Sequence, residues 1–155
     1  MRDLTVSQAK PNPAGKDHYS VDIPNYQLAG EWVDYKNSGI TDLSLDNIEL
    51  YHIAYTREKP DGEWEKVMGF QGILKVGEVV RVHSGGKTPL ANIRPIDIAG
   101  ADYHLFTGKN YVWNNSKSDT AGLWDTTKEV WVDKARYYAN PPEGKILKRY
   151  GDILV

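Results

Sequence analysis

The histidines and acidic side chains are the groups in this sequence that could hold a metal ion. The four histidines, His18, His52, His83 and His104, are far apart and show no His-x-x-x-His spacing, which is the pattern that places two imidazoles on one zinc ion. The sequence contains no cysteine, which excludes disulfides, thiolate metal sites and cysteine nucleophiles. We therefore expect no zinc site and no cofactor.

Two pairs of aspartates could offer oxygen ligands to calcium. They are Asp42 with Asp46, and Asp119 with Asp125. Neither pair lies in the twelve-residue loop pattern of a calcium-binding helix pair, and acidic side chains in loops more often cap turns. We expect no calcium site. A pair of carboxylates acting as in a glycosidase is not excluded by sequence, although the acids concentrate in turns.

The sequence shows no activated nucleophile and no phosphate-binding loop. A serine hydrolase of the Gly-x-Ser-x-Gly type needs a motif that is absent here. Ser84-Gly85-Gly86-Lys87 lacks the spacing of a P-loop, and we interpret it as a tight turn that ends a strand. The sequence therefore predicts a protein that is not an enzyme.

Two groups of residues could instead bind a partner. Residues 81–117 hold five bases against two acids, a local excess that could contact nucleic acid in a DNA-binding accessory module. The five bases are Arg81, Lys87, Arg94, Lys109 and Lys117. The second group is aromatic. Exposed Trp32, Trp64 and Trp131 could stack sugars or single-stranded nucleic acid, as a carbohydrate-binding module does, unless the flanking segments cover them.

Alternating short segments are expected to position these residues. Ten Tyr and five Trp, with fourteen Gly and eight Pro, favour pleated strands joined by many turns. Within the alternation Val33 and Tyr35 should face inward and Trp32 outward, and Val80 and Val82 should also face the core. The predicted strands are residues 4–8, 31–37, 48–55, 64–70, 79–83, 103–106, 111–113, 120–124 and 129–132. This number indicates an all-β sandwich of about eight or nine strands.

Length and charge set the remaining expectations. The 155 residues fit one domain, which we place at residues 1–135, with a tail at 136–155 that packs on it or is mobile. The formal net charge of −2 does not by itself recruit nucleic acid or anionic lipid. No segment is apolar enough for a membrane span, so no membrane insertion is expected. The chain shows no export signal, so it would be extracellular only if one had been removed, and cytoplasmic otherwise.

Four segments, in order, resemble the lamin tail domain family in its bacterial stand-alone type. They are Asn12-Pro13-Ala14-Gly15-Lys16-Asp17, then Glu31 to Asn37, then Leu74 to Gly85, and finally Asn110 to Asn115 followed by Asp119 to Asp125. The resemblance implies an immunoglobulin-like β-sandwich. It also implies a protein- and chromatin-binding surface, used in bacterial relatives for tethering or targeting. We therefore expect an interaction module whose partner is a protein or nucleic acid.

The residues that carry this resemblance are interpreted as structural. Asn37, Asn114 and Asn115 can satisfy unpaired backbone groups with their amides, and Asp119 can brace a turn by accepting from backbone N–H groups. Trp113 is interpreted as a core or rim aromatic. The binding surface should therefore lie elsewhere, on the basic stretch or on the outward tryptophans.

Overall fold

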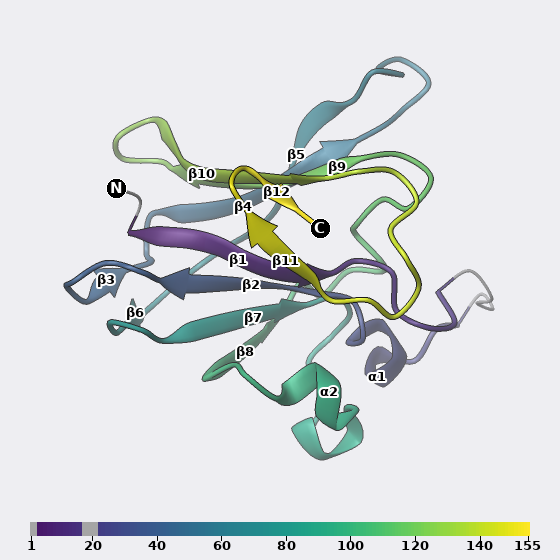
Figure 1. Cartoon of the computed structure of the whole chain (residues 1–155), viewed down its shortest axis with the longest axis horizontal. Helices are drawn as coiled ribbons and strands as arrows, with labels where there is room; N and C mark the ends of the chain where they lie inside the picture. The colour runs from purple at the N-terminus through teal and green to yellow at the C-terminus, as the bar shows by residue number, and fades with distance from the viewer. Residues whose placement is uncertain (1–2, 17–21) are drawn as a thin grey trace.

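The computed structural model describes residues 3–16 and 22–155 of the chain (Figure 1). Asp17 in the first family-like segment, and His18, lie outside the described residues. Strands make up most of the regular secondary structure of the described residues, with two short α-helices and one turn of 3-10 helix. The prediction of an all-β protein is confirmed.

The elements follow the alternation of the sequence. The strands are β1 (Leu4–Lys10), β2 (Trp32–Asn37), β3 (Leu43–Ser44), β4 (Ile48–Ala54), β5 (Glu63–Gly69), β6 (Ile73–Leu74), β7 (Val79–His83), β8 (Tyr103–Phe106), β9 (Asp119–Asp125), β10 (Val130–Tyr137), β11 (Leu147–Tyr150) and β12 (Ile153–Leu154). The helices are α1 (Asn25–Leu28), the 3-10 turn η1 (Leu90–Asn92) and α2 (Pro95–Ile98).

Ten of these strands form one curled, mixed sheet in the order β5-β4-β9-β10-β12-β11-β1-β2-β7-β8, and β3 pairs with β6 in a small second sheet. The pairs β7/β8 and β10/β12 are parallel, and the other pairs are antiparallel. In Figure 1 the β5-β4-β9-β10 part occupies the upper half and the β1-β2-β7-β8 part the lower half, with β11 and β12 between them. β5 and β8 are therefore the two edges of the large sheet.

The hydrophobic core fills the concave side of this curled sheet. Val33, Tyr35, Val80 and Val82 are buried in it, as the alternation predicted. Strands from the other half contribute to the same core, for example through Leu123 of β9. Burial of a side chain of this size contributes about 1.5–3 kcal/mol, so the shared core stabilises the curl and holds the two halves of the sheet together.

One predicted strand is wrong. Residues 111–113 form no strand, because their backbone N–H groups do not pair with a neighbouring strand. The N–H groups of Val112 and Trp113 instead donate to Oε1 of Glu31, at 2.7 and 3.3 Å. A buried carboxylate therefore replaces the ladder that the aromatic, β-branched composition had suggested. Trp113 itself is buried in the core.

The residues expected to form a tail are part of the large sheet. β10 runs through the expected boundary at residue 135, and β11 and β12 follow it. β11 pairs with β1 and β12 pairs with β10, so this last hairpin joins the two halves. Arg149 donates to buried Asp133, at 2.7 Å to Oδ2 and 3.1 Å to Oδ1, and to the Val6 carbonyl at 2.8 Å. The N–H of Val6 also donates to Asp133, at 2.9 Å.

Within the part of the chain that the structure describes, no helix has the length and apolar character needed to cross a membrane.

Candidate functional site

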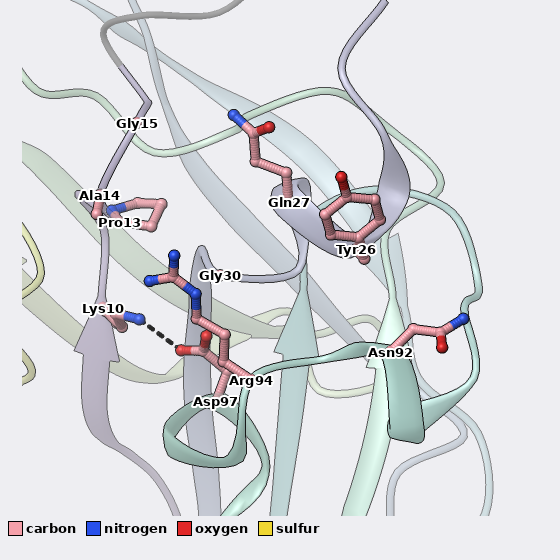
Figure 2. Close-up of a pocket in the computed structure, with 10 residues that line it drawn as sticks. All are labelled: Lys10, Pro13, Ala14, Gly15, Tyr26, Gln27, Gly30, Asn92, Arg94 and Asp97. Atoms are coloured by element: carbon pink, nitrogen blue, oxygen red, sulfur yellow. Dashed lines mark hydrogen bonds and ion pairs between the residues drawn. The ribbon is translucent and has the colours of Figure 1, made fainter.

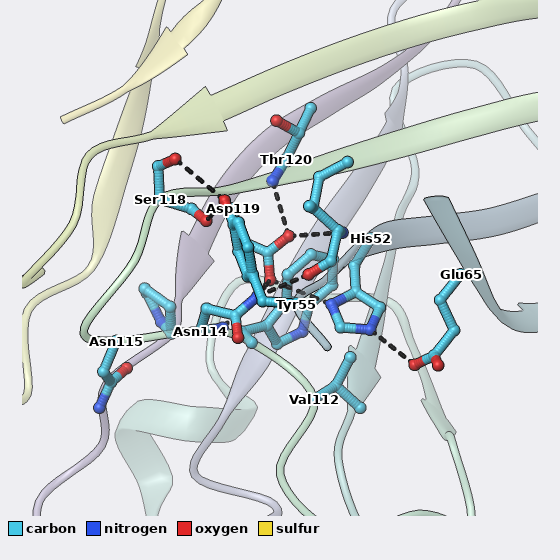
Figure 3. Close-up of polar contacts among 12 residues, drawn as sticks. His52, Tyr55, Glu65, Val112, Asn114, Asn115, Ser118, Asp119 and Thr120 are labelled. Atoms are coloured by element: carbon cyan, nitrogen blue, oxygen red, sulfur yellow. Dashed lines mark hydrogen bonds and ion pairs between the residues drawn. The ribbon is translucent and has the colours of Figure 1, made fainter. Parts of the chain in front are cut away.

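Asp119, at the start of β9, is the centre of a hydrogen-bond cluster (Figure 3). Its Oδ1 accepts from the backbone N–H groups of Ile53 and Thr120, at 2.7 and 2.8 Å. Its Oδ2 accepts from the backbone N–H and the side-chain amide of Asn114, at 3.1 and 2.9 Å. Because these donors belong to the turn before β9, to the start of β9 and to the neighbouring β4, Asp119 braces that turn. The predicted structural role of this residue is confirmed.

Among the side chains of the same cluster, His52 is the one whose imidazole could act as a general base. Its Nδ1 lies 3.1 Å from Oδ2 of Asp119 and its Nε2 lies 3.0 Å from Oε1 of Glu65. Burial lowers the pKa of His52, but the hydrogen bonds and charges of Asp119 and Glu65 outweigh it, and the pKa is raised above 6.5. A general base needs one ring nitrogen facing a nucleophile. Both nitrogens of His52 face carboxylates, so the ring links β4, β5 and β9.

The asparagines that carry the family resemblance also brace loops. The amide of Asn37 donates to the carbonyls of Thr41 and Leu74, at 2.8 and 2.9 Å, and its oxygen accepts from Gly39. Asn115 donates to the side chain of Asn12, at 2.9 Å. The predicted role in satisfying backbone groups is confirmed for Asn37 and for Asn114, whose amide donates to the Ile53 carbonyl at 2.6 Å. The amide of Asn115 contacts side chains instead.

Glu31 and Lys16 form a second buried polar centre. Lys16 Nζ lies 2.5 Å from Oε2 of Glu31, and Ser84 donates to Oε1 at 2.5 Å. Burial raises the pKa of Glu31, and the hydrogen bonds and the cation only partly offset this. The serine that precedes the Gly-Gly turn is therefore buried, and its hydroxyl donates to a buried carboxylate.

Two of the predicted binding residues are buried. Arg81 is fully buried and forms two hydrogen bonds with Asp34, at 2.7 and 2.9 Å. Trp32 faces away from the core as predicted, but α2 covers it, and its Nε1 donates to Asp97 at 2.9 Å. The guanidinium of Arg81 lies 3.7 Å from the centre of the Trp32 ring. The expectation that these two residues meet a ligand at the surface is corrected, because a segment distant in sequence buries them.

The other four bases of the predicted stretch are exposed but sit on different loops. Lys87 follows β7, Arg94 precedes α2, Lys109 follows β8, and Lys117 lies in the turn before β9. Lys109 donates to the backbone of β5 at 3.3 Å, and Lys117 lies 5.1 Å from the centre of the Tyr55 ring. The structure therefore distributes these charges over separate loops instead of along a single strand.

A hollow of about 340 Å³ lies where β1, α1 and α2 meet (Figure 2). Lys10 and Arg94 approach it, and its floor includes Gly30. Lys10 is already paired with buried Asp97, at 2.6 Å. Its charge is thereby neutralised, which leaves Arg94 as the cation without an ion pair among the described residues that line this hollow.

A pair of histidines, buried His83 and half-buried His104, lies at the C-terminal end of α1. Nδ1 of His83 lies 2.7 Å from the carbonyl of Ala29, so it donates, and Nε2 of His83 then accepts from Nδ1 of His104 at 2.8 Å. Burial is the main cause that lowers the pKa of His83, to about 4, and burial also lowers the pKa of His104. Both rings are therefore neutral near pH 7. In residues 3–16 and 22–155 no three metal-binding side chains gather.

The outward side of β5, β4, β9 and β10 carries a group of aromatic side chains that we call the outer aromatic face. Its members are Tyr51, Trp64, Trp124 and Trp131. The rings of Trp64 and Trp131 are 4.4 Å apart between centres, and Trp124 and Tyr51 meet Trp131 edge-on. Trp64 is 38% exposed. Two of the three tryptophans predicted to face outward therefore lie on one exposed surface.

Gly122 allows these rings to lie against the sheet. A Cβ at Gly122 would stand 2.8 Å from Cζ3 of Trp131 and 3.0 Å from Cζ3 of Trp64. Both distances are shorter than the roughly 3.5–4.0 Å that carbon atoms prefer. The absence of a side chain on β9 thus sets the height of both indole rings above the sheet.

A second hollow, of about 330 Å³, opens beside Trp64, and Thr120, Lys134, Arg136 and Asp152 complete its lining. We call it the Trp64 hollow. Sequence reasoning did not find its polar residues. The alternation of Lys134 and Arg136 along β10 was the available signal. The register shift between Trp131 and Asp133 that brings Trp131 to the same face, and the strand order that brings Trp64 near, are not visible in sequence.

No protein-family model matches this chain, and comparison with curated proteins likewise finds no significant match.

Proposed function

We propose that this chain is a non-enzymatic binding module with an immunoglobulin-like sandwich of the lamin tail type, which tethers or targets through its outer aromatic face. The family-like side chains support this reading because they brace loops. The hydrogen bonds of three such side chains, Asp119, Asn37 and Asn115, are made with other groups of the same chain. A scaffold of this kind leaves the sheet surface for recognition.

The observation that carries the proposal is the contrast between the buried polar groups and the exposed aromatic ones. His52, Ser84 and Arg81 are buried and hydrogen-bonded within the chain. Trp64, in contrast, is exposed beside two cations that line the same hollow. Exposed aromatic side chains next to positive charge are typical of binding surfaces.

Binding through this face can be tested with the intact chain and three probes: an acidic oligosaccharide, a neutral oligosaccharide and a single-stranded oligonucleotide. Saturable quenching of tryptophan fluorescence by at least one probe, lost in Trp64→Ala, supports the proposal. Tyr26→Ala is the matched control, since Tyr26 is an exposed aromatic of α1. If none of the probes binds, or if Trp64→Ala binds as the unchanged chain does, the proposed surface is wrong.

Binding of duplex DNA through residues 81–117 is the second candidate. Lys87, Lys109 and two further bases of that stretch are exposed. Affinity for duplex DNA should then fall steeply with salt because phosphate contacts release counterions. A double variant, Lys87→Ala with Lys109→Ala, should reduce the slope of that dependence. Duplex binding that is absent, or that does not respond to salt, would rule this candidate out.

A further inference from the structure

The Trp64 hollow combines one flat apolar wall with a charged one. Trp64 provides the flat wall, and its other side rests against Trp131. The volume of about 330 Å³ lies at the small end of the roughly 300–1,000 Å³ typical of ligand sites. One ring-sized chemical group stacked on the indole matches a hollow of this size.

Two cations on β10 form the charged wall. Lys134 and Arg136 are both exposed and, two residues apart on one strand, lie on the same face of the sheet. In the part of the chain that the structure describes, neither is in an ion pair. Lys134 lies 5.9 Å from the centre of the Trp131 ring, and Arg136 lies 5.7 Å from that of Tyr138. A guanidinium binds a carboxylate through two parallel hydrogen bonds, so this wall suits a carboxylate.

The strand register places the two walls opposite each other. Arg136 pairs with Thr120 on β9, and Lys134 pairs with Gly122. Trp64, on the edge strand β5, extends over Gly122 from the other side, since a Cβ added to that glycine would lie 3.0 Å from the indole. The indole and the two cations therefore border the same stretch of β9.

The remaining polar groups favour hydroxyl groups over phosphates. Thr120 carries a hydroxyl, and the Asp152 carboxylate is 80% exposed, 3.8 Å from Arg149. A carboxylate has about four acceptor positions, so Asp152 can accept further hydrogen bonds from ligand hydroxyls. A DNA phosphodiester backbone has no hydroxyl groups to donate to this carboxylate, whereas a sugar ring has several.

Building on the proposed binding function, we infer that the Trp64 hollow binds an acidic sugar residue of the uronic acid class within an oligosaccharide. The pyranose ring stacks on Trp64, the carboxylate meets Arg136 and Lys134, and ring hydroxyls donate to Asp152. Stacking by exposed Trp supplies the apolar contact, and the charge-assisted pair supplies selectivity for an acidic over a neutral sugar.

The test titrates the intact chain with a galacturonic acid hexamer, a neutral galactose hexamer and a thymidine dodecamer, measured by calorimetry and tryptophan fluorescence. The acidic hexamer should bind at least about tenfold more tightly than the neutral one, as expected for one charge-assisted hydrogen-bonded pair. Trp64→Ala should weaken binding of the acidic hexamer by about tenfold or more. Arg136→Gln should remove the preference for the acidic hexamer over the neutral one, and Tyr26→Ala should change neither. Circular dichroism melts of each variant establish that it is folded.

The outcomes separate this inference from the proposed function. Binding of the oligonucleotide alone, lost in Trp64→Ala, overturns the inference and leaves the binding module intact. Equal affinity for the acidic and neutral hexamers overturns the role of the cations. Binding of the acidic hexamer that survives both Trp64→Ala and Arg136→Gln shows that the site is elsewhere. If no probe binds, both the inference and the proposed function fail.

Discussion

Gly122→Ala tests whether the outer aromatic face is set by the bare backbone of β9. The added Cβ would stand 2.8 Å from Trp131 and 3.0 Å from Trp64. Carbon contacts prefer about 3.5–4.0 Å, so one or both indoles must move away by about 0.5–1 Å. Overpacking of this kind costs about 1–3 kcal/mol. For a chain of this length each kcal/mol lowers the melting temperature by about 2–4 °C, which gives a decrease of roughly 2–12 °C.

Gly69→Ala is the matched control, because Gly69 is also a strand glycine and a Cβ there meets nothing within 4 Å. It should melt at or slightly above the temperature of the unchanged chain, since alanine restricts the unfolded state by about 0.4–1 kcal/mol. Thermal melts followed by circular dichroism measure both. Near-ultraviolet spectra report on the coupled rings of Trp64 and Trp131. The reasoning is refuted if Gly122→Ala is as stable as Gly69→Ala and leaves the aromatic spectrum unchanged.

Three further predictions concern ionisable side chains that are buried or that pair with a buried group. The folded pKa of His52 is raised above 6.5, so the stability it contributes is complete below pH 6.5 and is lost as the pH rises through the folded pKa. His52→Gln should therefore cost more at pH 5.5 than at pH 8.5 in urea unfolding, and an equal cost would contradict this. The pKa of His83 is lowered to about 4 in the folded chain. As the pH drops below 6.5 the unfolded chain therefore takes up a proton on His83 before the folded chain does, and the free energy of unfolding falls. An NMR titration in which the His83 ring of the folded chain titrates near pH 6.5 would contradict this. Arg149→Ala removes the Arg149 guanidinium from buried Asp133, which should cost about 3–5 kcal/mol of stability. Adding Asp133→Asn should recover part of this loss, and additive losses would show that the two residues act independently.

Local patterns in the sequence were sufficient to place most strands and to identify the side chains that hydrogen-bond to turns. Alternation correctly oriented Val33 and Val82 toward the core, because the side-chain period of a strand needs no knowledge of its neighbours. Asp119 was predicted to brace its own turn for the same local reason. The strand expected at residues 111–113 failed because a buried carboxylate, Glu31, takes its N–H groups, and such a partner is invisible to periodicity.

The candidate site could be predicted only in part, since its residues meet through strand order. Trp32 and Trp64 looked equivalent in sequence, yet α2 covers Trp32 with Asp97, 65 residues away, while Trp64 stays exposed. Lys134 and Arg136 show a regular alternation, but nothing local indicates that only β4 and β9 separate β10 from β5. Binding surfaces assembled across a sheet therefore need the topology before they can be recognised.

The way the sheet closes has a consequence for synthesis. β1 pairs with β2 on one side and with β11 on the other. The partner of Gln8 in β11 is Lys148, 140 residues away in the sequence. A ribosome-bound chain therefore exposes the open edge of β1 until β11 has emerged, and open edges invite aggregation. Completion of the large sheet therefore depends on the synthesis of β11, and a chaperone that shields the edge of β1 would act before β11 pairs with it.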